Sequence, residues 1–133
     1  MPQVSLTPLA SDVQLAKGWD NVTRAIMLAG KTLSRPQSQW LAEPYLVDGC
    51  ESQVWLFADK GQIFAWSDAK IIRGVVALVL EKAHTMNMAD IASFDFADYL
   101  AQLGLERHLS QSRADGINQV IRRLRQLAGQ QLC

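Results

Sequence analysis

The chain has 133 residues, of which 49% are hydrophobic and 20% are charged, and this composition is typical of an ordinary globular protein. Lysine plus arginine number 13, as do aspartate plus glutamate, so the formal net charge is zero. The balance gives no indication of a nucleic-acid or membrane partner. We expect a single domain over residues 1–133 with one modest core.

The start of the chain, MPQVSLTPLASDVQL, lacks the basic stretch and the long apolar segment of a secretory signal. No apolar run approaches the ~20 residues needed to span a bilayer. The two cysteines, Cys50 and Cys133, are too few for a disulfide framework. We therefore expect a cytoplasmic protein in which both thiols are reduced.

The first periodic segment is predicted to be a helix. Between Trp19 and Leu33, apolar residues recur at the spacing of one helix face. Pro36 and small polar residues then interrupt the pattern and predict a loop. Pro44 disfavours helical geometry at Glu43, which predicts an extended approach to the first cysteine.

A β-hairpin is predicted next. Residues 52–58 alternate between two faces, both fairly apolar, which indicates a strand covered on both sides. Residues 59–61, Asp-Lys-Gly, supply a tight turn, and residues 62–66 form the returning strand. Cys50 lies directly before the first strand.

The segment after the hairpin is predicted to be a buried helix. Ser67 and Asp68 resemble a helix start, and the residues up to about His84 are apolar nearly all round. Gly74 in the middle of such a helix costs roughly 1 kcal/mol relative to alanine. We expect close contact with another element, such as the hairpin, to compensate for this cost.

The rest of the chain is predicted to be helical. Two short helices end at Gly104, and a capping-box pattern at Ser112 and Asp115 precedes an amphipathic helix over residues 117–127. The fold class is α+β, a small antiparallel sheet packed by helices. The last helix is mildly basic at Arg122, Arg123 and Arg125. Such a run is more often a solvated face than a surface for an acidic partner.

Cys50 is the best candidate for chemistry, because phosphate-binding glycine loops and serine-hydrolase motifs are absent. His84 and His108 lack the short spacing of a zinc site, so we expect no metal. Cys50 could be a small buried hydrophobe or a reactive thiol. Asp48 and Glu51, if close, would raise its pKa and favour the unreactive thiol. Arg113, His108 or groups of a partner would then have to activate it.

Three motifs, GCESQVWL, SDAKIIRG and LGLERHLSQSRADGI, together resemble the SufE/CsdE family of sulfur-acceptor proteins, the partners of cysteine desulfurases in iron–sulfur cluster assembly. The resemblance extends from about Trp19 to Arg125 with the motifs in family order. It implies a curved, three-stranded antiparallel sheet packed by helices. The third strand would be the segment near residues 45–47 or another segment that the alternation pattern does not reveal.

The resemblance also implies residue roles. Cys50 would accept persulfide sulfur from the desulfurase, stimulate that enzyme and pass the sulfur onward to a receiving protein or iron–sulfur scaffold. Asp68, His108 and Arg113 fall on family positions that we expect to support the pocket and its loop. Helix-terminal capping and a surface ion pair stay open as alternative roles for Asp68 and Arg113. The pyridoxal phosphate cofactor would belong to the desulfurase, so this chain would be an accessory protein without a cofactor, monomeric or a weak homodimer.

The residues expected to contact the partner are Gly49, Glu51 and Ser52, which flank the cysteine. The sequence departs from the family pattern at Gln111, in place of a proline, and at Trp66, in place of an aspartate. Glu51 resembles the CsdE branch rather than the SufE branch.

Two other function classes stay open. One is an enzyme with Cys50 as nucleophile and His108 as base, and the other is an interaction module with a structural Cys50 and the basic last helix as contact surface. Cys133 is expected to be an incidental terminal thiol rather than a second sulfur site.

Overall fold

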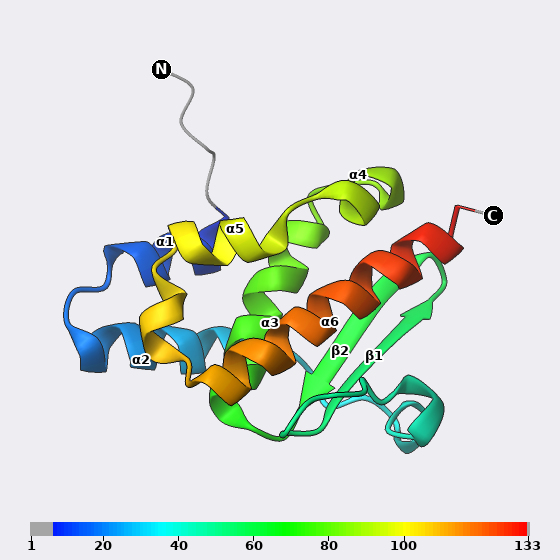
Figure 1. Cartoon of the computed structure of the whole chain (residues 1–133), viewed down its shortest axis with the longest axis horizontal. Coiled ribbons are helices and arrows are strands. Elements are labelled where there is room, and N and C mark those ends of the chain that lie inside the picture. Colours follow the sequence, from blue (N-terminus) through cyan, green and yellow to red (C-terminus); the bar gives the residue numbers. More distant parts are fainter. Residues whose placement is uncertain (1–6, 133) are drawn as a thin grey trace.

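The computed structural model describes residues 7–132. Helices dominate this part of the chain, and Figure 1 shows α3 in the middle, with α2 on one side, the hairpin on the other and α6 in front. The elements are α1 (Pro8–Leu15), α2 (Trp19–Gly30), β1 (Val54–Asp59), β2 (Gln62–Ser67), α3 (Lys70–Ala83), α4 (Met88–Ser93), α5 (Phe96–Gln102) and α6 (Gln111–Gln130), with 3-10 turns η1 (Ser38–Trp40), η2 (Glu43–Tyr45) and η3 (Leu105–His108). The α+β class is confirmed.

The central helix α3 is buried over most of its length, as its nearly uniform apolar pattern predicts. It crosses α2 where two glycines meet. A Cβ added to Gly74 would lie 2.6 Å from Cγ2 of Ile26, and one added to Gly30 would lie 3.0 Å from the nitrogen of Gly74. The expected compensating contact at Gly74 is therefore present, but it is made by α2 and not by the hairpin.

The hairpin has the predicted tight turn. Strands β1 and β2 pair antiparallel from Val54 opposite Ser67 to Asp59 opposite Gln62. The two turn residues, Lys60 and Gly61, have φ angles of 51° and 79°, the left-handed pair that a type I′ turn requires.

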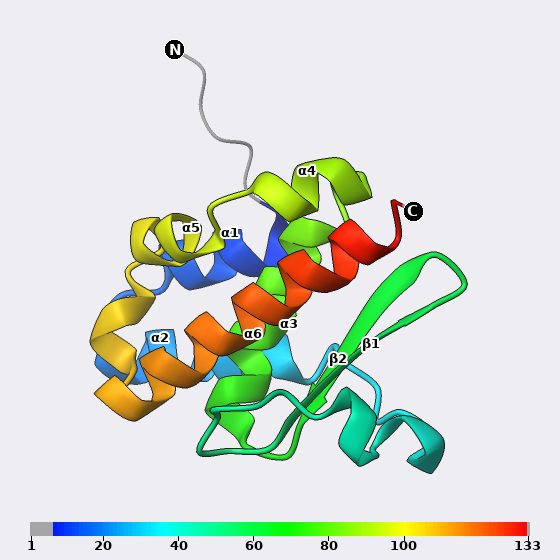
Figure 2. The same cartoon turned by 45° about the vertical axis from the view of Figure 1, so that its right-hand side comes forward.

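The described sheet has two strands rather than about three. The expected third segment makes one isolated bridge, Leu46 to Trp55, and the nitrogen of Val47 donates to the carbonyl oxygen of Val54 at 2.8 Å. The segment cannot continue as a strand because η2 ends directly before it and Gly49, with φ +83°, turns the chain after it. Figure 2 shows this segment beside the start of β1.

Both faces of β1 are covered, as the sequence predicts. One face contributes Val54 and Leu56 to the helical core. On the other face, the ring of Trp40 stacks on Phe57 at 4.4 Å between centroids, and Tyr45 meets the same ring edge-on. The segment predicted as a loop and an extended approach thus contains two 3-10 turns that carry this aromatic cover.

Helix starts differ from the sequence patterns. Ser67 is the buried last residue of β2 rather than the N-cap of α3, which is Ala69. Its hydroxyl donates to the carbonyl oxygen of Gln53 at 2.8 Å and accepts from the nitrogen of Ala69 at 3.2 Å. Helix α6 begins two residues earlier than the predicted cap indicates, because Ser110 and not Ser112 is its N-cap. Helix α1 has no counterpart in the sequence prediction. The carboxylate of Glu81 in α3 stabilises the first turn of α1, because it accepts from the nitrogen of Leu9 at 2.8 Å.

No helix within residues 7–132 is both long enough and apolar enough to cross a membrane.

Candidate functional site

Cys50 lies on the loop that joins η2 to β1, and this loop packs against α6. The Cys50 side chain is half-buried, and its Sγ donates to the carbonyl oxygen of Gly116 at 3.3 Å. Gly49, with φ +83°, adopts the left-handed conformation that favours glycine. The turn at Gly49 therefore directs the thiol toward the helix rather than toward solvent.

Two residues of α6, one turn apart, receive the loop. A Cβ added to Gly116 would lie 3.6 Å from the Sγ of Cys50, and one added to Gly49 would lie 3.1 Å from Cγ of Gln119. Gly116 is buried, so at this point the thiol faces bare helix backbone. Gly116 was not among the functional residues predicted from the sequence. A glycine in the first turns of an otherwise good amphipathic helix is the signal that could have identified it.

A small cavity of about 10 Å³ adjoins the thiol. That volume is about the space of one water-sized atom. Its lining combines the loop, the start of β1, α3 and the first turns of α6, in the residues Cys50, Glu51, Ser52, Val54, Ile72, Ser112, Arg113 and Gly116. Next to the cysteine there is thus room for about one additional heavy atom.

The surroundings hold Cys50 in the unreactive thiol form. Burial is the largest cause that raises the pKa of Cys50 above its ordinary value of 9.0, and the negative charge of Asp48 raises it further. Both effects disfavour the thiolate, which is the nucleophilic form. The sequence prediction of a raised pKa is in line with this direction, although burial acts more strongly than the neighbouring acid.

Of the three residues expected to support the pocket and its loop, Arg113 lines the cavity. It lies in the first turn of α6, where its backbone nitrogen donates to Ser110 Oγ at 3.4 Å, and its side chain is exposed. The causes that shift the pKa of Cys50 are burial and the charge of Asp48, and Arg113 is not among them.

Asp68 lies outside the cavity lining, at the junction of β2 and α3. Its carboxylate accepts from Arg35 Nη1 at 3.1 Å and from Trp66 Nε1 at 3.1 Å. The ion pair with Arg35 is exposed. The neighbouring Ser67 bonds the carbonyl oxygen of Gln53, so Asp68 connects to the Cys50 loop only through the end of β2.

His108 also lies outside the cavity lining. Its ring stacks on Trp19 at 4.2 Å between centroids, and its Nδ1 lies 3.5 Å from the hydroxyl of Thr23. Within residues 7–132 the cavity lining contains no histidine, so this arrangement does not form the Cys–His pair of the alternative enzyme hypothesis. Cys133 falls outside the described residues.

Comparisons with known proteins agree on one family. The family model described as "SufE: Fe-S metabolism associated domain" matches residues 7–128. The chain belongs to the SufE family. An uncharacterized SufE-like protein of Haemophilus influenzae is 29% identical over 124 residues, covering 90% of this chain and 98% of the relative. Another, from Rhizobium meliloti, is 33% identical over 129 residues, covering 91% and 92%.

The fold is shared more widely than the sequence. The solution structure of a hypothetical protein from Thermus thermophilus matches with a TM-score of 0.73 at 13% identity, covering 96% of this chain and 98% of that one. The SufE family resemblance inferred from the three motifs is confirmed, and with it a link to iron–sulfur metabolism.

Within residues 7–132 of this SufE-family chain, no group of three or more histidine, cysteine or acidic side chains is arranged to hold a metal ion. His84 lies with its Nε2 2.9 Å from the carbonyl oxygen of Ile63, away from His108 on Trp19.

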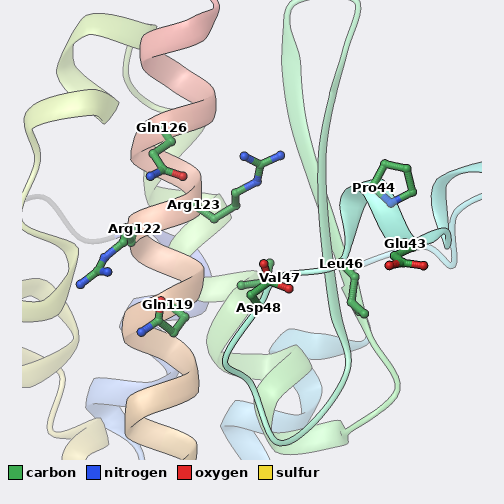
Figure 3. Close-up of a pocket in the computed structure, with 9 residues that line it drawn as sticks. All are labelled: Glu43, Pro44, Leu46, Val47, Asp48, Gln119, Arg122, Arg123 and Gln126. Atoms are coloured by element: carbon green, nitrogen blue, oxygen red, sulfur yellow. The ribbon is translucent and has the colours of Figure 1, made fainter.

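A larger groove of about 720 Å³ runs beside the same loop, between α6 and the segment from η2 to Asp48 (Figure 3). Its lining residues are Glu43, Pro44, Leu46, Val47, Asp48, Gln119, Arg122, Arg123 and Gln126. The arginines were predicted from the sequence as part of a basic helix. Their place opposite two acidic residues was not predicted, because the two walls are more than 70 residues apart in the sequence.

Proposed function

We propose that this protein is a sulfur carrier that accepts persulfide sulfur from a cysteine desulfurase onto Cys50 and passes it on for iron–sulfur cluster assembly. The observation that carries the proposal is the cavity of about 10 Å³ beside Cys50, in a chain whose family is associated with iron–sulfur metabolism. A volume of that order holds about one water-sized atom, directly beside the thiol that would carry the added sulfur.

The transfer is a thiol exchange. The Cys50 thiolate attacks the terminal sulfur of the desulfurase persulfide, so that a new S–S bond forms on Cys50. The S–S bond of the desulfurase persulfide breaks, and its inner sulfur leaves as a thiolate. The terminal sulfur keeps its proton, and no external oxidant is consumed. The desulfurase supplies the pyridoxal phosphate chemistry that produces the persulfide, and this chain acts as its accessory protein.

The resting arrangement protects the acceptor. The Cys50 thiol is half-buried, bonded to the Gly116 carbonyl and raised in pKa, so it reacts slowly with small molecules in solution. Transfer requires the loop to leave α6. The single thiol hydrogen bond is weak, which favours such a release. After transfer, the same site would shield the persulfide from water and reductants.

The neighbours of Cys50 are suited to partner contact. Gly49 and Glu51 are exposed, and Ser52 is half-buried beside the cavity. A desulfurase that docks over this loop would meet these residues first and would supply charges that stabilise the thiolate. Arg113, which lines the cavity, would add its positive charge on docking.

Asp68 and His108 would act at a distance. Asp68 would hold the junction of β2 and α3, and His108, stacked on Trp19, would fix the connector that precedes α6. In this proposal both are positioning residues, because neither lines the cavity that adjoins Cys50.

The test is the intact mass of the protein after incubation with cysteine and a cysteine desulfurase from the same organism. Wild-type protein should gain one or more sulfur atoms that dithiothreitol removes. The Cys50→Ser variant should gain none and should unfold at the same denaturant concentration as wild type within error. Cys133→Ser is the matched control and should accept sulfur normally. Sulfur acceptance retained by Cys50→Ser would overturn the proposal.

A further inference from the structure

The groove of about 720 Å³ beside α6 has walls of opposite charge. The α6 wall carries Arg122 and Arg123, and the opposite wall carries Glu43 and Asp48. Figure 3 shows Arg123 reaching from α6 toward the hairpin, while Arg122 projects to the other side of the helix. The carboxylate of Asp48 lies between α6 and the hairpin in the same view.

These charges are not used inside the molecule. Within residues 7–132 the ion pair present is the one between Arg35 and Asp68, so the groove's arginines and acids have no partner in the described chain. Arg123 is half-buried, whereas Asp48 is exposed. Arg123 and Asp48, which lie toward the space between the two walls without an ion-pair partner, favour an occupant that carries both signs.

An extended polypeptide segment meets this requirement. Its successive side chains point to opposite sides, so a segment that alternates acidic and basic residues presents one sign to each wall. A nucleic acid is disfavoured because Glu43 and Asp48 would repel its phosphates. Leu46 and Val47 supply an apolar contribution on the same wall.

We propose that this groove docks an extended segment of a partner protein, with an acidic side chain set against Arg123 and a basic side chain set against Asp48. The site is separate from the residues that line the cavity at the thiol.

A segment bound in the groove would affect Cys50 through the loop that contains both Asp48 and Cys50. Asp48 precedes Cys50 by two residues, and Gly49 packs on Gln119, a residue that also lines the groove. The charge of Asp48 contributes to the raised pKa of Cys50. A basic side chain placed on Asp48 compensates that charge and favours the thiolate. The effect on Cys50 rests on the proposed function of Cys50 as sulfur acceptor. The docking of a partner segment in the groove does not depend on that function.

The experiment uses the full-length protein and a fluorescent, end-blocked, eight-residue peptide of alternating glutamate and lysine. Binding is measured by fluorescence anisotropy at low salt, with all-glutamate and all-lysine peptides for comparison. Wild type should bind the alternating peptide most tightly. Arg123→Glu and Asp48→Lys should each weaken that binding about tenfold, since each places like charges together.

The double charge swap should restore binding, because the alternating peptide can shift by one residue and present the opposite signs. Arg24→Glu is the matched control, an exposed arginine on α2 outside the groove, and it should leave binding unchanged. Equal binding of the all-glutamate or all-lysine peptide, or single swaps no worse than Arg24→Glu, would overturn the docking proposal.

A second measurement on the same samples follows alkylation of Cys50 by iodoacetamide, read from the mass of the peptide that contains it. Saturating alternating peptide should raise the rate at least about twofold, since it compensates Asp48. An unchanged rate would overturn the link to Cys50. Neither assay contains a desulfurase, so a failure here is distinct from a failure of sulfur acceptance.

Discussion

Glycine lets two parts of this chain approach a helix closely, and the two contacts differ in how tightly they close. At the crossing of α2 and α3, a Cβ on Gly74 would lie 2.6 Å from Ile26 Cγ2 and even closer to the Ile26 backbone. At the Cys50 loop, a Cβ on Gly116 would lie at ordinary contact distance, 3.6 Å from the thiol sulfur. The first contact is permanent packing, and the second leaves the room that the proposed loop release and the proposed sulfur atom on Cys50 would need.

The largest expected effect is at the tight contact. Gly74→Ala should destabilise the protein by about 3 kcal/mol or more, because the added methyl overlaps backbone that cannot move alone. Urea denaturation measures the loss. Gly129→Ala is the control, since nothing lies within 4 Å of its added Cβ, and it should be neutral or stabilising by up to about 1 kcal/mol. Equal stability of the two variants would contradict the packing difference.

A methyl group added at the contact between Gly116 and the Cys50 loop should change the function of the protein rather than its stability. Gly116→Ala should keep the free energy of unfolding within about 1 kcal/mol of wild type, since the gain in helix propensity offsets the new contact. The added methyl takes up space in the cavity, so the Cys50 persulfide should be lost several-fold faster. Intact mass after removal of the desulfurase follows the decay. A lifetime equal to that of wild type would show that the cavity does not shelter the added sulfur.

Features that depend on neighbours in the sequence could be predicted, whereas contacts between distant elements could not. The turn at Lys60 and Gly61 and the burial of α3 depend on neighbours in the sequence, and both were predicted. The partner of Gly74 was not, because a glycine signals close approach without naming the element that approaches. The segment near residues 45–47 was predicted to be a third strand, but it makes one isolated bridge. The turn at Gly49 ends the segment and directs Cys50 toward α6.

The residues of the candidate site also divide into those that could be identified from the sequence and those that only the fold brings together. Cys50 and its acidic neighbours are local and could be identified from the sequence and the family motifs. The cavity and the groove could not, because Gly116 and Gln119 reach the loop from α6, 66 or more residues later. Asp68 and His108 belong to conspicuous motifs, yet their side chains bond Arg35 and stack on Trp19 away from the cavity.

The smallest expected effect concerns the charge at the loose contact. Asp48→Asn should lower the pKa of Cys50 without bringing it to its ordinary value, because burial is the larger cause and persists. The pH profile of Cys50 alkylation should therefore shift to lower pH, and the rate at neutral pH should rise about twofold. Glu51→Gln, which removes a carboxylate on the other side of the cysteine, is the matched control and should shift the profile less.

The sign of the pH dependence of stability follows from the same shift. The folded protein holds the Cys50 proton more tightly than the unfolded chain, so this contribution to stability is complete below the ordinary thiol pKa of 9.0 and is lost as the pH rises through the raised value. Asp48→Asn should reduce that loss, and Cys50→Ser should abolish it. Identical loss of stability in wild type and Cys50→Ser above pH 9.0 would mean that the loop releases the thiol before it ionises, and that the contact with Gly116 is looser than its geometry indicates.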